Sequence, residues 1–171
     1  MAVTANLTVS ASGSQTGSTI VGGAPTYPFS TSASAAYSSG TGAGQVDRVY
    51  TATRTLSASA TEDLDLAGSL TDALGNTAIA FARIKSILVS AAAANTNNVQ
   101  VTRPASNGVP WLMAAGDGIA LRPGAAVAWL SGAADASGVV VTAGTGDLIT
   151  VTNSAGTTSV TYTIVITGCS A

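Results

Sequence analysis

Short stretches in which apolar and polar residues alternate recur along the chain from about residue 46 onward. In the clearest of them, residues 160–167, four large apolar residues are separated by threonine or valine. An alternation with a period of two is typical of a strand with one buried face, because successive side chains of a strand point to opposite faces. Residues 79–91 form the densest apolar stretch, and their β-branched residues favour a buried strand over a helix. The pattern therefore predicts an all-β domain.

Turn-forming residues separate these stretches. Residues 95–98, 116–118 and 123–124 are rich in asparagine, glycine or proline, which suit the backbone of tight turns, and residues 144–147 predict a hairpin loop. Only residues 67–76 suggest a single helical turn. Short strands at intervals of about 8–12 residues predict an antiparallel β-sandwich or barrel, and we expect a jelly-roll-like antiparallel β-sandwich. The expected strands are residues 46–57, 62–66, 79–91, 99–103, 111–113, 119–121, 127–130, 139–142, 148–152 and 160–167.

Residues 1–45 follow a different pattern. They contain no charged side chain and are dominated by serine, threonine, glycine and alanine. Residues 3–10 alternate weakly, as in a short strand, residues 22–29 predict a turn or extended chain, and residues 38–44 form a glycine-rich hinge. Too few large apolar residues are present for a separate core. We therefore divide the chain into an extended N-terminal arm or peripheral hairpin, residues 1–45, and a β-sandwich domain, residues 46–171.

The composition limits the classes of partner. The chain has 171 residues, enough for one domain with its own core, and only 8% of them are charged, with a net charge of −2. An acidic, charge-poor protein does not bind nucleic acid by neutralising phosphates, so we expect no nucleic-acid partner. No apolar stretch reaches the roughly 18 residues that a membrane-spanning helix needs, so we expect no membrane partner. Few charges weaken the repulsion between copies, which suits an assembly component, although a GC-rich genome would also favour alanine, glycine and valine.

The composition also disfavours enzymatic chemistry. Without histidine and with one cysteine, the chain cannot build a typical zinc cluster or a nucleophile activated by imidazole. The glycine-rich segments 40–44 and 144–147 lack the lysine of a phosphate-binding loop and are expected to be turns. We expect no enzyme activity, no catalytic residue, no metal site and no cofactor. Carboxylates are concentrated at only four positions, which we expect on a solvent-facing strand edge rather than around calcium or as an acid–base pair: Glu62, Asp63, Asp65 and Asp72.

A few single residues remain open to two interpretations. Arg48 and Arg54 share a strand face and are expected to pair either with the carboxylates of residues 62–65 or with a partner subunit. Cys169 is expected to be a small buried residue, the alternative being an intermolecular disulfide bond. The N-terminus has neither the positive charge nor the continuous apolar stretch of a secretory signal, so we expect no export by that route.

Aromatic residues are scarce, at 5% of the chain, so their positions are informative. Tyr27, Phe29 and Tyr37 lie in the uncharged arm, and we predict that they bind a partner, because aromatic anchors dominate interface energetics. The alternative is that they fold back on the chain's own sandwich. Trp111 and Trp129 are expected to lie in the core or to form a stacking platform for sugar rings.

Several segments resemble small structural proteins of tailed bacteriophages. The most extensive is residues 51–76, TATRTLSASATEDLDLAGSLTDALGN. The resemblance covers roughly residues 45–171, and none of its motifs is catalytic. The other segments that carry it are residues 81–89, 95–98, 122–124, 144–153 and 162–168.

This resemblance implies a virion component, most similar to a capsid decoration (cement) protein. Such proteins are often β-sandwich homotrimers that sit on the outside of the capsid and clamp neighbouring capsomers. The expected partners are then the major capsid protein and further copies of this chain, and the expected location is the capsid exterior after synthesis in the bacterial cytoplasm. Two other hypotheses remain open: a tail, neck or head-fibre component of the same virion, and a carbohydrate-binding β-sandwich that uses Trp111 or Trp129.

Overall fold

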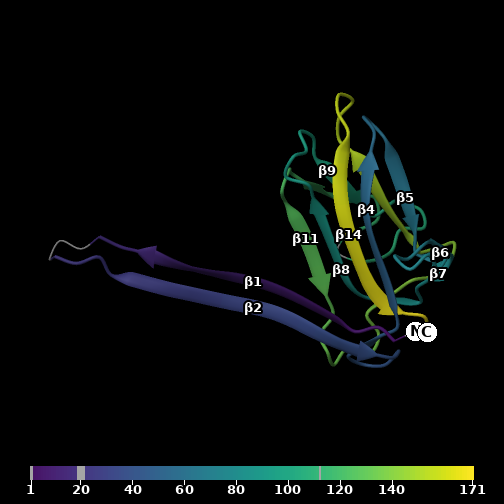
Figure 1. Ribbon diagram of the computed structural model, residues 1–171, viewed down its shortest axis with the longest axis horizontal. Coiled ribbons are helices and arrows are strands. Elements are labelled where there is room, and N and C mark those ends of the chain that lie inside the picture. The colour runs from purple at the N-terminus through teal and green to yellow at the C-terminus, as the bar shows by residue number, and fades with distance from the viewer. Residues whose placement is uncertain (1, 19–21, 112) are drawn as a thin grey trace.

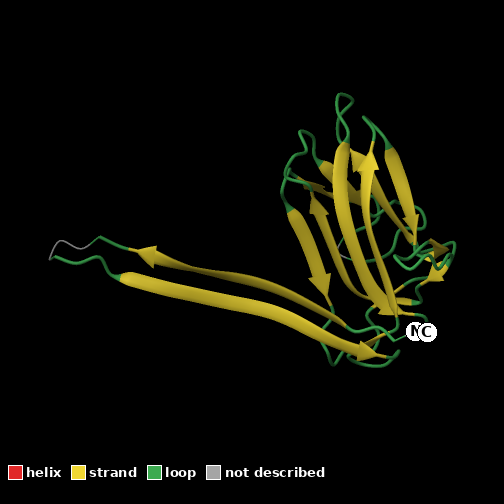
Figure 2. Cartoon of the chain, viewed as in Figure 1, coloured by secondary structure: helices red, strands yellow, loops and turns green. Residues whose placement is uncertain are grey.

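The protein is all β, and the computed structural model describes residues 2–18, 22–111 and 113–171. Within these ranges every regular element is a strand (Figure 2). Most of the strands form two antiparallel sheets that lie against each other, and a long two-stranded hairpin projects away from them (Figure 1). The expectation of an all-β chain with antiparallel sheets, the arrangement of a β-sandwich, is confirmed. The jelly-roll connection and the role of residues 1–45 as an arm stay predictions.

The first sheet has the strand order β11-β8-β14-β4, and β12 pairs with the other part of β8. All of its pairs are antiparallel, and the ladder between β14 and β8 shifts register between Thr167 and Gly168. The central strand β14 alternates as its sequence predicts, because the side chains of Val160, Tyr162 and Ile164 are fully buried. The strands of this sheet are β4 (Arg48–Leu56), β8 (Arg83–Ala91), β11 (Ala126–Leu130), β12 (Val139–Val140) and β14 (Val160–Cys169).

The second sheet has the strand order β10-β9-β13-β5, also antiparallel throughout. Its apolar side chains, such as Val101 and Ile149, pack in one core cluster with the inward residues of the first sheet. A small sheet of two strands closes one end. The strands are β5 (Thr61–Asp65), β9 (Val99–Thr102), β10 (Gly118–Leu121) and β13 (Leu148–Asn153), and the small sheet consists of β6 (Ala67–Leu70) and β7 (Ile79–Ala80).

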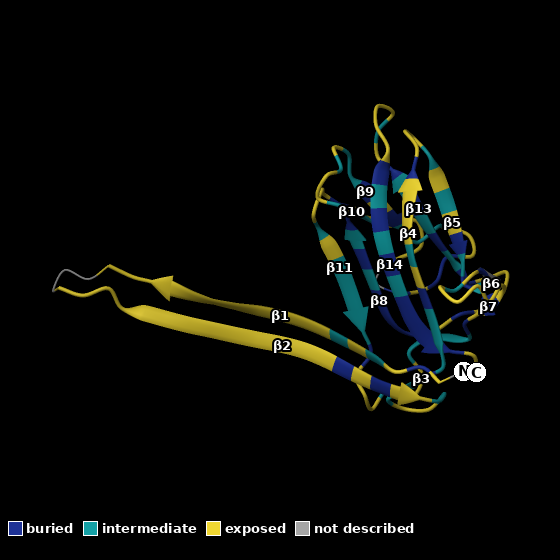
Figure 3. Cartoon of the chain, viewed as in Figure 1, coloured by how far each residue is buried: buried dark blue, intermediate teal, exposed yellow. Residues whose placement is uncertain are grey.

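The N-terminal segment is a hairpin rather than a single extended chain. β1 (Ala5–Thr16) and β2 (Thr26–Ser39) pair along their whole length, and the short β3 (Gln45–Val46) lies parallel to the end of β2. Figure 3 shows the hairpin exposed over most of its length, with buried positions only where β2 meets the body. The sequence left two possibilities for residues 1–45, an extended arm and a peripheral hairpin, and the structure has the hairpin.

Several local expectations were wrong. Trp111 and Met113 lie in a loop instead of a strand, and residue 112 lies outside the described residues. Residues 67–76 form β6 and a turn, without a helical turn. The loop at residues 144–147 does not join a hairpin of two neighbouring strands, because β12 pairs with β8 and β13 pairs with β5 and β9. The turn-forming residues predicted that hairpin, but β12 pairs instead along Arg83 and Ile84 of β8 at the edge of the first sheet.

Candidate functional site: the projecting hairpin and its root

The hairpin has two chemically different faces. Residues directly opposite each other in an antiparallel pair lie on the same face, so the register of β1 and β2 sorts the side chains. The apolar face carries the pairs Ala5–Tyr37, Leu7–Ala35, Val9–Ala33, Ala11–Thr31, Gly13–Phe29 and Gln15–Tyr27. The polar face carries the pairs Asn6–Ala36, Thr8–Ser34, Ser10–Ser32, Ser12–Ser30, Ser14–Pro28 and Thr16–Thr26. Neither face has a charged residue.

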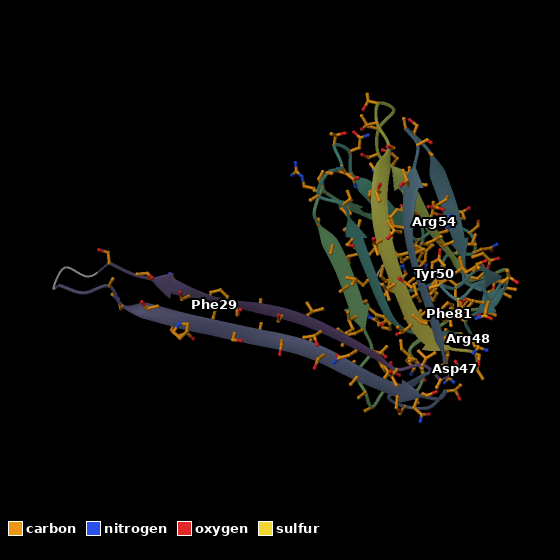
Figure 4. All side chains as sticks on the ribbon, viewed as in Figure 1. Phe29, Asp47, Arg48, Tyr50, Arg54 and Phe81 are labelled. Atoms are coloured by element: carbon orange, nitrogen blue, oxygen red, sulfur yellow. The ribbon has the colours of Figure 1, made fainter. Side chains whose placement is uncertain are left out.

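Most of the apolar face is open to solvent. The exposed fractions are 70% for Tyr27, 49% for Phe29 and 44% for Val9. The ring of Phe29, labelled in Figure 4, lies over Gly13, where an added Cβ would come within 2.7 Å of it. The 12 residues of β1 span about 40 Å at about 3.4 Å per residue. Because a lone two-stranded ribbon is marginally stable in water, this uncovered apolar face is a surface suited to a partner.

Tyr37 holds the hairpin to the body. Its side chain is 3% exposed, and its hydroxyl oxygen lies 2.8 Å from the carbonyl oxygen of Ser131 and 3.0 Å from that of Lys85. It packs with Val3, Ala35 and Val46 in a second core cluster. Burial raises the pKa of Tyr37, and the hydrogen bonds to Ser131 oppose this in part. Tyr37 is therefore part of the chain's own structure, the alternative stated for it above, whereas Tyr27 and Phe29 remain exposed.

We call the junction between the hairpin and the body, formed around Tyr37, Arg83 and Lys85, the root of the hairpin. Arg83 holds three segments of the chain together there. Its guanidinium donates hydrogen bonds to the carbonyl oxygens of Thr41, at 2.9 Å, and Ala136, at 2.8 Å. It also donates to the carbonyl oxygen of Ala171. The loop that returns from β2, the loop after β11 and the end of β14 thus meet at one side chain. Cys169 adds a contact from its thiol to the carbonyl oxygen of Gln45, and it is fully buried, as expected for a small core residue.

The loop after β11 covers the buried lysine of the root. Lys85 is 0% exposed, and its Nζ donates to the carbonyl oxygen of Asp135 at 2.5 Å. The carboxylate of Asp135 accepts hydrogen bonds from the backbone N–H groups of Gly138 and Ser137. These bonds lower the pKa of Asp135, and the charge of Lys85 contributes less. The root is thus a network of polar contacts, buried at Tyr37 and partly buried or exposed around it, which joins the hairpin to the body.

A concave corner lies between the hairpin and the first sheet. It encloses about 300 Å³ and is lined by the start of β1, including Ala5 and Leu7, and by Val49, Leu88 and Val165 of the sheet. The side chains around it are mostly apolar, so the apolar face of the hairpin continues directly onto the sheet.

The outward-pointing side chains of the first sheet, which we call the outer face, are also uncharged. The hydroxyl oxygens of Thr53 and Thr163 lie 2.9 Å apart and those of Thr55 and Thr161 lie 3.0 Å apart, which ties β4 to β14 across this surface. Beside the root, this face is partly covered by the chain's own hairpin, because Ser86 and Thr167 are buried and Val49 and Leu130 pack against the second core cluster. From the register, the other members of the outer face are Thr51, Thr53, Thr55, Leu88, Ser90, Ala126, Ala128, Thr161, Thr163 and Val165.

The carboxylates of the sequence cluster are dispersed among structural contacts. Glu62 accepts a hydrogen bond from the Tyr162 hydroxyl at 2.7 Å and pairs with Arg54, which links β5 of one sheet to β4 and β14 of the other. Burial is the main cause that raises the pKa of Tyr162, and the hydrogen bond to Glu62 raises it further. Asp63 accepts from the hydroxyl of Thr150. Among the described residues, no three histidine, cysteine, aspartate or glutamate side chains are grouped to hold a metal ion.

The two arginines of β4 have different partners. Arg54 pairs with Glu62, which was one of the expected arrangements, although the two strands belong to different sheets. Arg48 pairs with its neighbour Asp47, at 3.3 Å, rather than with residues 62–65. The ion pair with Glu62 raises the pKa of Arg54 further.

The tryptophans do not form an open platform. Trp111 is 9% exposed, and Trp129 is partly buried on the inner side of β11, where both pack with the core cluster. In the described residues no helix is long and apolar enough to cross a membrane. No protein-family model matches the chain, and no curated protein or solved structure is significantly similar to it.

Proposed function

We propose that this protein is a non-enzymatic virion structural protein that binds the outside of a bacteriophage capsid and stabilises it, that is, a decoration or cement protein. The observation that carries the proposal is the rooted hairpin, whose uncharged apolar face is exposed along residues 9–16 of β1, about 27 Å beyond the root. The resemblance that the sequence of residues 45–171 carries, although no family model or similar protein matches the chain, is what directs the proposal to this class. In this proposal the major capsid protein and neighbouring copies of the chain are the partners.

Many weak contacts suit such a role. If each copy contributes only a few kcal/mol, a shell that carries many copies gains a large total stabilisation, since the contacts are multivalent. The exposed aromatic residues Tyr27 and Phe29 then act as anchors of the hairpin, because large rings supply much of the energy of an interface. The charge-poor surface lets copies approach each other closely.

Immunogold labelling of purified particles tests the location. An antibody against this chain is expected to label the heads densely, with the copy number, measured by quantitative mass spectrometry, in the hundreds per particle. Label confined to the tail or neck at a dozen copies or fewer would replace decoration by a tail, neck or fibre role. Unlabelled particles would contradict the virion assignment.

A second experiment tests the hairpin. Particles that lack this protein are incubated with purified wild-type chain, with Phe29→Ser, or with Ser30→Asp as a control on the polar face. Wild type and the control are expected to bind, and Phe29→Ser is expected to bind at least ten-fold more weakly. Equal binding of all three would remove the hairpin from the interface.

A further inference from the structure

The apolar face of the hairpin is too long to be covered by the body from which it projects. Only Ala35 and Tyr37 of β2 are buried, both at the root, while the remaining positions of the strand are exposed. The hairpin leads away from its own sandwich (Figure 1), so the far half of the apolar face has no cover within the chain. Any cover for it has to come from a second molecule.

The chain itself offers a surface of matching character. The outer face of the first sheet has no charged residue, as the apolar face of the hairpin has none. A charged partner surface would lose its hydration against such a face without gaining an ion pair, which disfavours it. Threonine methyl groups together with Leu88, Val165 and Ala128 give the outer face an apolar component that can pack against Val9, Ala33 and Phe29.

The dimensions also match. A body of residues 46–171 has a radius of gyration of about 14 Å and thus a width of roughly 35 Å. The part of β1 beyond the root, residues 9–16, spans about 27 Å at about 3.4 Å per residue, so it reaches across most of one neighbouring body of the same size. Leu7 of β1 lines the concave corner together with Leu88 of β8 and Val165 of β14. An uncharged surface therefore continues from the hairpin onto these two strands.

We propose that the hairpin of one molecule docks with its apolar face on the outer face of the sheet β11-β8-β14-β4 of a second copy of this chain. The contact is heterologous, because the hairpin and the sheet are different surfaces, so repetition closes a ring or extends a filament. This inference names the partner of the hairpin within the proposed function. It rests on the proposed function only for its biological setting, because its test measures self-association without any capsid.

Neighbouring residues on opposite faces of β1 supply the matched pair of variants. Val9→Asp places a carboxylate on the apolar face, and Ser10→Asp places the same carboxylate one residue along on the polar face. Val165→Asp charges the outer face at the corner, and Gln100→Asp, on an exposed position of β9, charges the other sheet instead. Circular dichroism and thermal unfolding establish that each variant is folded, and Val9→Thr with Ala33→Thr keeps strand propensity and neutrality while removing apolar contact.

Sedimentation equilibrium over micromolar concentrations gives the oligomeric state. Wild type, Ser10→Asp and Gln100→Asp are expected to self-associate with similar affinity, while Val9→Asp and Val165→Asp are each expected to be at least ten-fold weaker and the double threonine variant intermediate. A mixture of Val9→Asp with Val165→Asp is expected to form a one-to-one complex, because one intact hairpin and one intact sheet remain.

Each other outcome overturns the inference. A wild-type chain that stays monomeric has no hairpin-to-sheet contact between copies. Association that survives Val165→Asp but not Val9→Asp means that hairpins pair with each other. An equal loss in Ser10→Asp means that the apolar face is not the contact. Failure of self-association with continued binding to particles would leave the decoration role standing and assign the hairpin to the capsid.

Discussion

Tyr27 and Tyr37 lie on the same strand and the same face of the hairpin, yet their surroundings differ completely. Tyr27 is 70% exposed near the far end, and Tyr37 is 3% exposed at the root. The hydroxyl of Tyr37 reaches the carbonyl oxygens of Ser131 and Lys85, and the latter also accepts from the N–H of Ser131. A tyrosine is therefore exposed to solvent at one end of the strand, and at the other end it is buried and hydrogen-bonds the hairpin to the body.

Substitutions of these two tyrosines measure how much the Tyr37 hydroxyl contributes to the stability of the root. Tyr37→Phe keeps the ring and removes the hydroxyl, so a buried carbonyl loses its donor, and we expect the free energy of unfolding to fall by about 1–2 kcal/mol. Tyr27→Phe, the control, is expected to change it by less than about 0.5 kcal/mol. Urea unfolding followed by tryptophan fluorescence measures both. Equal effects would mean that the hydroxyl of Tyr37 does not stabilise the root.

Asp135 makes the root sensitive to acid. The backbone N–H groups of Gly138 and Ser137 lower the pKa of its carboxyl in the folded protein. A depressed carboxyl pKa stabilises the fold above the unfolded value of about 3.9, and this contribution is lost as the pH falls through the lower folded value. We expect Asp135→Asn to be less stable than wild type at pH 7 and the difference to shrink below about pH 3. Thermal unfolding of both proteins from pH 7 to pH 2 measures this, and a constant difference would contradict it.

At the scale of the element, the hairpin divides into a root that the body needs and a projecting part that it does not. Val3, Ala35, Tyr37 and Val46 form the second core cluster. Removal of residues 2–45 would delete three members of this cluster, Val3, Ala35 and Tyr37, together with the projecting strands. Its effect on binding would then be mixed with damage to the body.

A shorter deletion separates the two. Replacement of residues 9–33 by Asn-Gly joins Thr8 to Ser34, which already face each other, through a two-residue turn. We expect the thermal unfolding midpoint of the body to change little, because those of the removed side chains that the structure describes are exposed, while binding to particles and to other copies is lost. Differential scanning calorimetry and a particle pull-down measure the two effects. A body that fails to fold would contradict the division.

The strands of the sandwich could largely be predicted, whereas for residues 1–45 the sequence left an extended arm and a peripheral hairpin open and did not predict how β1 and β2 pair. Val160, Tyr162, Ile164 and Ile166 are large, alternate strictly and are all buried, so their period alone defines β14. The apolar face of the hairpin consists largely of alanine and single aromatic residues on two strands. Its alternation becomes visible only once β1 is aligned against β2. Pro25 and Pro28 further suggested irregular chain, although a proline is tolerated at the edge of a two-stranded ribbon.

The root was also beyond sequence reasoning, for a different reason. Its contacts join residues far apart in the chain, such as Tyr37 with Ser131 and Arg83 with Ala171. Nothing local to Tyr37 distinguishes it from Tyr27. The pairing of Arg54 with Glu62 was accessible because the two residues lie close in sequence and opposite in charge, but the placement of their strands in different sheets was not.

At the scale of the whole molecule, the uncharged hairpin and outer face determine how binding responds to salt. Contacts between charged surfaces weaken as salt screens them, whereas apolar contacts are insensitive to sodium chloride and strengthen in sulfate. We expect the dissociation constant for self-association or particle binding to change by less than about two-fold between 0.05 and 1 M sodium chloride and to fall in ammonium sulfate. Analytical ultracentrifugation across these salts measures it, and a steep loss of affinity would indicate a charged interface instead.

The hairpin, held at one end, is also a lever. At about 40 Å in length, a rotation of only about 10° at Tyr37 and Arg83 would swing its tip by roughly 7 Å, more than the spacing between neighbouring strands of a sheet. Small adjustments among buried atoms are thus magnified into a choice of which surface the tip can reach. A substitution deep in the root, far from any contact, would then change the curvature or closure of an assembly without altering a single residue of its interface.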